Sequence, residues 1–164
     1  MRIVVDTNVI ISGIFFGGKP REILNNCFSK IHQMVCTEEI FEEYIATIER
    51  LTEKLGRNVG KEIEPLLVEN LEFIENKYSD SYSRDPEDDK FIHCAKSGNI
   101  AYIISGDKDL LVLNEIDGIK IVGVTDFLDR TRNKWEFEED NKKNGTENAI
   151  VMVFTGCKNT RHHM

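Results

Sequence analysis

The stretch MRIVVDTNVIISG, residues 1–13, decides the fold, because it places polar side chains between two apolar runs. Residues 2–5 have the pattern of a buried strand, and the apolar residues after position 8 begin a buried helix. Asp6, Thr7 and Asn8 lie between them. A carboxylate buried without a partner costs several kcal/mol. Asp6 therefore either caps the helix or binds a positive group that the sequence does not supply.

The composition is that of one soluble globular domain: 164 residues, of which 40% are hydrophobic and 30% charged. No apolar run approaches the roughly 18 residues of a membrane span. The strand pattern begins at residue 2, so we expect no signal peptide. Four isolated cysteines argue against a zinc site or a disulfide framework and fit a cytoplasmic protein; they are Cys27, Cys36, Cys94 and Cys157.

The net charge of −8 bears on possible ligands. Proteins that bind nucleic acid through a broad surface are usually basic. A polyanion could bind this chain only where metal ions or a local basic strip offset the acidic residues.

Strand patterns alternate with amphipathic helices along residues 1–134. Such alternation requires crossover connections, which give a parallel sheet covered on both faces. We therefore expect an α/β three-layer sandwich with a central, mostly parallel sheet of four or five strands. Residues 135–164 are expected to form a C-terminal appendage, with a strand over 149–156. The expected strands of the domain are 2–5, 33–36, 101–105 and 119–124, and the expected helices are 9–16, 20–30, 38–55, 59–74 with a kink or break at Pro65, 86–97, and two short segments after residues 106 and 124.

Two acidic residues follow strands of this sheet. Asp6 ends the first strand, and Asp107 comes shortly after the strand over 101–105. The carboxyl ends of parallel strands form the crevice where ligands bind. Both carboxylates are therefore expected to face one cleft.

The helix expected over 86–97 adds a third acid, with Asp85 as its cap. At about 100° per residue, Asp88 lies within the apolar stripe of this helix, whereas Asp89 lies on the solvent side with His93. An acid in the first turn can simply stabilise its own helix. The alternative is that Asp88 is directed into the same cleft as Asp6 and Asp107.

Glu43 is the fourth candidate. It flanks the buried stripe of the helix over 38–55, on the same edge as Arg50 and Lys54. A glutamate at such a boundary is most often a surface residue. Beside three inward acids, it could instead complete a site.

Carboxylates grouped without matching basic partners repel one another unless a cation neutralises them. Sites built only from oxygen ligands favour Mg²⁺ or Mn²⁺. Thr7 and Asn8 would then either orient Asp6 by hydrogen bonds or cap the following helix.

Four motifs occur in a specific order: VDTNV at 5–9, TEEIFEEY at 37–44, DPEDDKFIHCA at 85–95 and IISGDKDLL at 103–111. Together they resemble a PIN domain, the metal-dependent nuclease fold found in toxins of bacterial and archaeal toxin–antitoxin modules. The resemblance covers residues 1–130 and is closest to the toxin branch of the family.

The resemblance implies four catalytic acids, of which Asp6, Asp88 and Asp107 would bind Mg²⁺ or Mn²⁺. It also implies an RNA substrate, an antitoxin partner and a homodimer. The fourth acid and the supporting residues implied by the resemblance are Glu43, Thr7, Asn8, Ser105 before the last acid, and Asp109 as an outer or additional ligand. Arg50, Lys54, Arg57 and Lys61 are either a local basic strip for the RNA backbone or an ordinary solvated helix face and its loop.

Two other interpretations are open. Haloacid-dehalogenase-type phosphatases also begin with a strand that ends in Asp, but they have a second Asp where this chain has Asn8. A PIN-like module that binds RNA or protein without cleaving would be expected to lack some of the acids. All four positions are filled here.

Overall fold

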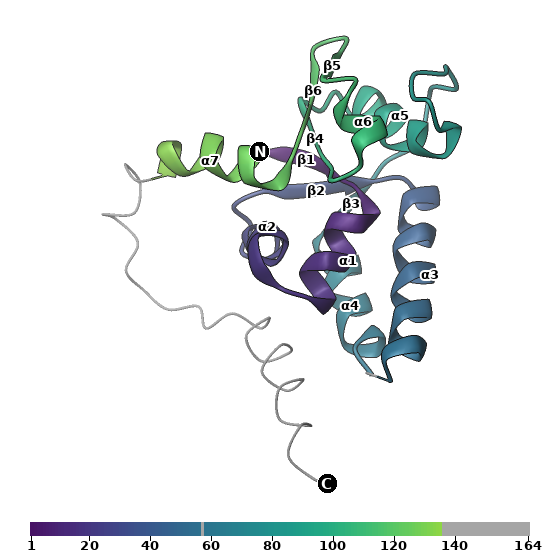
Figure 1. Ribbon diagram of the computed structural model, residues 1–164, viewed down its shortest axis with the longest axis vertical. Coiled ribbons are helices and arrows are strands. Elements are labelled where there is room, and N and C mark those ends of the chain that lie inside the picture. The colour runs from purple at the N-terminus through teal and green to yellow at the C-terminus, as the bar shows by residue number, and fades with distance from the viewer. Residues whose placement is uncertain (57, 136–164) are drawn as a thin grey trace, which may run out of the picture.

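The computed structural model has a six-stranded sheet with the strand order β3-β2-β1-β4-β6-β5 (Figure 1). It describes residues 1–56 and 58–135. All neighbouring strands are parallel except β5 and β6, which form an antiparallel hairpin. The strands are β1 Arg2–Val5, β2 Gln33–Cys36, β3 Leu71–Phe73, β4 Tyr102–Ile104, β5 Glu115–Ile116 and β6 Ile119–Val122.

Helices cover both faces of the sheet. Figure 1 shows α1 to α4 on one side of β1 and β2 and α5 on the other, while α7 packs against α2. The α/β sandwich with a mostly parallel sheet is thereby confirmed. The helices are α1 Thr7–Phe15, α2 Gly18–Phe28, α3 Glu38–Leu55, α4 Gly60–Asn70, the 3₁₀ turn η1 Pro86–Asp88, α5 Asp89–Ser97, α6 Lys108–Leu111 and α7 Val124–Trp135.

The central strand explains why the opening of the chain is so apolar. Ile3, Val4 and Val5 are all fully buried, because side chains on both faces of β1 meet helices. Parallel strands covered on both sides typically have such continuous aliphatic runs. The tyrosine hydroxyl of Tyr44, in α3, donates to the Val5 carbonyl and fixes this helix to the end of β1.

Two short edge strands were not predicted, which raises the number of strands from four or five to six. The helix expected over 59–74 ends at Asn70, and residues 71–73 pair with β2 as β3. Pro65 lies inside α4 without dividing it. The second missed strand, β5, turns into β6 through Asp117 and Gly118, both with positive φ. Asp-Gly is a common sequence for such two-residue hairpin turns.

The arrangement of crossovers places a topological switch point between β1 and β4. The connections that follow β1 and those that lead to β4 cover opposite faces of the sheet (Figure 1). Ligands bind at such switch points in open α/β sheets, outside the carboxyl ends of the strands. Asp6 and Ser105 directly follow these two strands.

The expected appendage over 135–164 begins at the last described residue, and its strand over 149–156 lies outside the described residues. The boundary between domain and appendage therefore stays a prediction. Within residues 1–56 and 58–135, no helix is long and apolar enough to cross a membrane.

Candidate metal centre

Three carboxylates meet at the carboxyl end of the sheet. One oxygen each of Asp88, Asp107 and Asp109 lies within 4.8 Å of the others, and all three residues are half-buried. Asp88 ends η1, while Asp107 and Asp109 come from the turn between β4 and α6. Two segments distant in sequence thus converge on one place where a cation could be bound.

Ser105 connects this group to the first strand. Its buried hydroxyl donates to Asp6 Oδ2 at 2.7 Å and accepts the backbone N–H of Asp107 at 2.9 Å. Asp107 in turn caps α6, and its Oδ1 accepts the backbone N–H of Asp109 at 2.8 Å. One hydroxyl therefore fixes the relative positions of two acidic residues.

Asp6 is 4% exposed and is itself the N-cap of α1. Its Oδ1 accepts the backbone N–H of Asn8 at 3.4 Å, and its own N–H donates to the Ile104 carbonyl at 2.9 Å. Burial raises the pKa of Asp6; the Ser105 hydrogen bond acts in the opposite direction. Asp6 is adjacent to the three acids through Ser105 but does not belong to their close group.

Asp88 carries the clearest sign of a missing partner. Its Oδ2 is buried and has no hydrogen-bond partner among the described residues. Asp85, not Asp88, caps the turn, by accepting the Glu87 N–H at 3.0 Å. Burial raises the pKa of Asp88 to about 6, and nearby negative charges, Asp107 first, add to the effect. A divalent cation would supply the missing partner, so the residues present fit a metal site.

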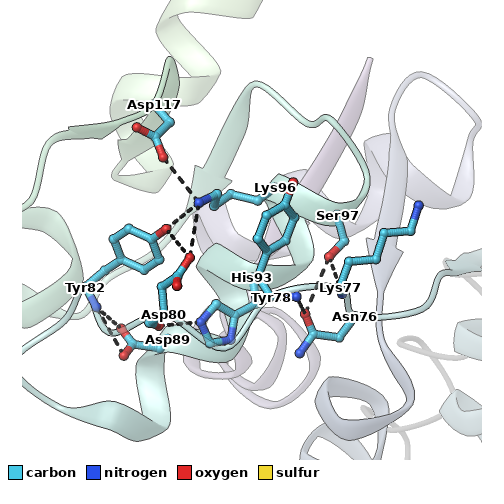
Figure 2. Close-up of polar contacts among 10 residues, drawn as sticks. All are labelled: Asn76, Lys77, Tyr78, Asp80, Tyr82, Asp89, His93, Lys96, Ser97 and Asp117. Atoms are coloured by element: carbon cyan, nitrogen blue, oxygen red, sulfur yellow. Dashed lines mark hydrogen bonds and ion pairs between the residues drawn. The ribbon is translucent and has the colours of Figure 1, made fainter.

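The helical phase predicted for Asp89 was wrong. Asp89 is 4% exposed, and its carboxylate accepts the backbone N–H groups of Ser83, at 2.6 Å, and Tyr82, at 3.3 Å. The preceding segment, at residues 82 and 83, covers the first turn of α5 on the side where Asp89 projects, and a contact with a segment outside the helix cannot be read from the phase of the helix alone. His93 is half-buried, and its Nε2 lies 2.6 Å from the Asp80 carbonyl oxygen (Figure 2).

Glu43 lies apart from the three close acids, and both of its oxygens are engaged. Oε1 accepts the hydroxyl of Thr7 at 2.5 Å, and Oε2 forms an ion pair with Lys90. Thr7 thus contacts Glu43 rather than Asp6. Lys90, only 8% exposed, was not identified from the sequence. Its place next to Phe91 in the expected helix was a weak sign that Lys90 would be buried. Its partner, Glu43, lies on another helix, α3, and could not be identified from the sequence around Lys90.

Arg50 and Lys54 have exposed side chains on α3. They lie seven and eleven residues beyond Glu43, which is roughly 10 and 16 Å along the helix axis. They are therefore about two to three helical turns from Glu43 along α3, and their role in binding RNA stays a prediction.

The fold and this acidic group can be compared with known proteins. The sequence model of the PIN domain family matches residues 2–109, more than half of the chain and a range that includes all the acids discussed. No curated protein and no solved structure matches the chain. PIN domains are generally metal-dependent nucleases that act on nucleic acids. From the matched range, together with its parallel sheet and its acids, the chain belongs to the PIN domain family.

Proposed function

We propose that this protein is a ribonuclease that hydrolyses RNA phosphodiester bonds with Mg²⁺ or Mn²⁺. The observation that carries the proposal is the group formed by Asp88, Asp107 and Asp109, with oxygens within 4.8 Å and one buried oxygen of Asp88 unpartnered. Hard divalent cations prefer such carboxylate sets. Membership of the PIN family supports a nuclease rather than a phosphatase of the haloacid dehalogenase type.

In this proposal, Asp88 and Asp107 are direct metal ligands, with Asp109 as the third. Asp6 completes the site, directly or through water, because Ser105 holds it next to Asp107. Thr7 and Asn8 support the arrangement through Glu43 and through the backbone N–H to Asp6, respectively.

A bound divalent cation lowers the pKa of a coordinated water and offsets negative charge on the phosphate. Hydrolysis then forms a bond between the water oxygen and phosphorus, breaks the bond from phosphorus to the leaving oxygen, and transfers a proton to that oxygen. The chain's own contribution is to hold the carboxylates close together and fixed in position. The half-buried position of the three acids strengthens their attraction for a cation compared with carboxylates in bulk water.

The RNA backbone would be bound by a small basic strip. With a net charge of −8, the protein as a whole repels a polyanion, so binding depends on the metal ion and on Arg50 and Lys54. Such binding weakens as salt is raised, because displaced counterions return to the RNA.

The biological setting that we propose is a cytoplasmic toxin–antitoxin module, in which this chain is the toxin. The order and spacing of the four motifs, which resemble the toxin branch of the family, support this setting. It implies a homodimer and an antitoxin protein that holds the nuclease inactive. A PIN-like module that binds RNA or protein without cleaving is the alternative, and the filled acidic positions favour cleavage.

The test is cleavage of an end-labelled single-stranded RNA at low salt with Mn²⁺, Mg²⁺ or EDTA. Asp88→Asn is the test variant, and Asp129→Asn, an exposed acid on α7, is the matched control. We expect metal-dependent cleavage that Asp88→Asn loses and Asp129→Asn keeps. Cleavage that persists in Asp88→Asn would show that the site is wrong. Binding of RNA without cleavage under any condition would favour the non-catalytic alternative.

A further inference from the structure

Lys90, a buried lysine beside Glu43, has no role in the proposed reaction. Lys90 lies in the first turn of α5, is 8% exposed, and pairs its ammonium with Glu43 Oε2. A second acid, Glu87, lies 3.6 Å from the same ammonium, and Glu39 adds negative charge nearby. A lysine is seldom buried this deeply unless acids neutralise it.

The number of acids at this end of the sheet would allow two cations. Asp88, Asp107 and Asp109 form one group, and Asp6 and Glu43 interact electrostatically beside it. In two-metal sites the ions lie about 3.5–4 Å apart and both contact carboxylates. Glu43 would be the natural ligand for a second ion if its oxygens were free.

Both carboxylate oxygens of Glu43 are occupied, because Oε1 accepts a hydrogen bond from the Thr7 hydroxyl and Oε2 forms an ion pair with Lys90. A divalent cation at Glu43 would either displace the ammonium from its buried position or lie beside it. Displacement would leave the lysine without its nearest partner, and proximity would place like charges together where little water screens them.

We infer that the Lys90 ammonium takes the place of a second divalent cation at Glu43, so that the chain binds one metal ion, at Asp88, Asp107 and Asp109. This inference rests on the proposed function. Glu43 is then a positioning residue and not a metal ligand. It joins Thr7, which follows Asp6, to Lys90, which lies two residues after Asp88. One carboxylate thus sets the distance between the segments that carry these two acids.

The experiment is a calorimetric titration of the full chain with Mn²⁺, in the absence of RNA. We compare the wild type with Lys90→Gln, Glu43→Gln and the double variant that carries both changes. Lys19→Gln is the control, because it removes one lysine charge from an exposed position on another helix, α2.

We expect one Mn²⁺ per chain for the wild type and for Lys19→Gln. Lys90→Gln should gain a second, weaker ion, and the double variant should return to one. Glu43→Gln should keep its single ion with affinity about tenfold lower, the cost of losing a residue that orients the ligands.

Two ions in the wild type, with one lost in Glu43→Gln, would overturn the inference. A folded Lys90→Gln that still binds one ion would also overturn it. If Lys90→Gln does not fold, Glu43→Gln decides, because loss of an ion there would make Glu43 a ligand. One bound ion without RNA cleavage would contradict the proposed function alone, and a wild type that binds no Mn²⁺ would contradict both.

Discussion

At the scale of single residues, Asp88 is where folding and function conflict. Its carboxylate has a buried oxygen without a partner, and three other acids that surround it, Asp107, Asp6 and Asp109, belong to the same site. A structure selected for stability alone would replace such a group. A cation bound there would supply the missing interaction and offset the repulsion among the acids.

We expect Asp88→Asn to stabilise the metal-free protein at pH 7.5. The variant removes the cost of burying a charge and the repulsion from the neighbouring carboxylates. We expect the melting temperature to rise by about 2–4 °C, the shift that about 1 kcal/mol gives in a chain of this size. Thermal unfolding in EDTA measures it. With Mn²⁺ the order should reverse, because only the wild type gains from binding. A variant less stable than the wild type in EDTA would contradict this account of Asp88.

The pH dependence follows from the same residue. The pKa of Asp88 is about 6 in the folded protein and 3.8 ordinarily, so the folded state takes up a proton first. Without metal, ionised Asp88 lowers the free energy of unfolding. This destabilisation is complete above pH 6 and disappears as the pH falls toward 4, where Asp88 is protonated in the folded protein. Metal binding needs the ionised form. The gain in melting temperature from Mn²⁺ should therefore be large at pH 7.5 and should shrink below pH 6. A gain that is equal at pH 7.5 and pH 5 would contradict the assignment of Asp88 as a ligand.

At the scale of elements, the segment between β3 and η1 is held by side chains of α5. Figure 2 shows Asp89 directed at the backbone of Tyr82, while Lys96 contacts Tyr82, Asp80 and Asp117. The Lys96 ammonium also lies 4.5 Å from the Tyr78 ring centroid. These contacts fix the segment that leads directly into Asp85 and Asp88.

Asp89→Ala should therefore lower the free energy of unfolding. It leaves the backbone N–H groups of Tyr82 and Ser83 without their acceptor, and each such loss costs about 1–3 kcal/mol. Urea unfolding monitored by circular dichroism measures the loss, with Asp129→Ala as the control. An unchanged midpoint in Asp89→Ala would show that these contacts do not hold the segment.

At the scale of the whole molecule, the sequence predicted the architecture but not its edges. Continuous aliphatic runs such as residues 3–5 identified the central strands. The three residues of β3 continue the pattern of the preceding helix, and pairing with β2 determines their conformation. Such short edge strands depend on a neighbour, so local pattern does not reveal them.

The same limit applied to the candidate site. Strand ends predicted that Asp6 and Asp107 lie near each other, and in the structure Ser105 hydrogen-bonds to both. The helical stripe selected Asp88, which lies in the close acidic group. Asp109 was expected only as an outer or additional acid, although its spacing of two residues from Asp107 is typical of a capped turn. The ion pair between Glu43 and Lys90 joins α3 to α5, and a contact between distant helices has no signature in either segment alone.

Because the protein has a net charge of −8, its affinity for RNA should depend strongly on the few basic residues of the strip. Arg50→Gln and Lys54→Gln should each weaken binding of any single-stranded RNA and lower the slope of log affinity against log salt by about 0.7. Fluorescence anisotropy between low and moderate salt, with Asp88→Asn used to prevent cleavage, measures both quantities. Lys120→Gln, at an exposed lysine on β6, is the control. An unchanged slope in both variants would remove Arg50 and Lys54 from the RNA path.

The most direct test of the central claim is a crystal structure of the protein soaked with Mn²⁺, with the ion located by its anomalous scattering. We predict a peak bound by oxygens of Asp88, Asp107 and Asp109, at about 2.1 Å as for other small hard divalent cations. Such a peak would establish the metal centre independently of any activity. A peak bound by Glu43 instead, or no peak at these three carboxylates at saturating Mn²⁺, would contradict it.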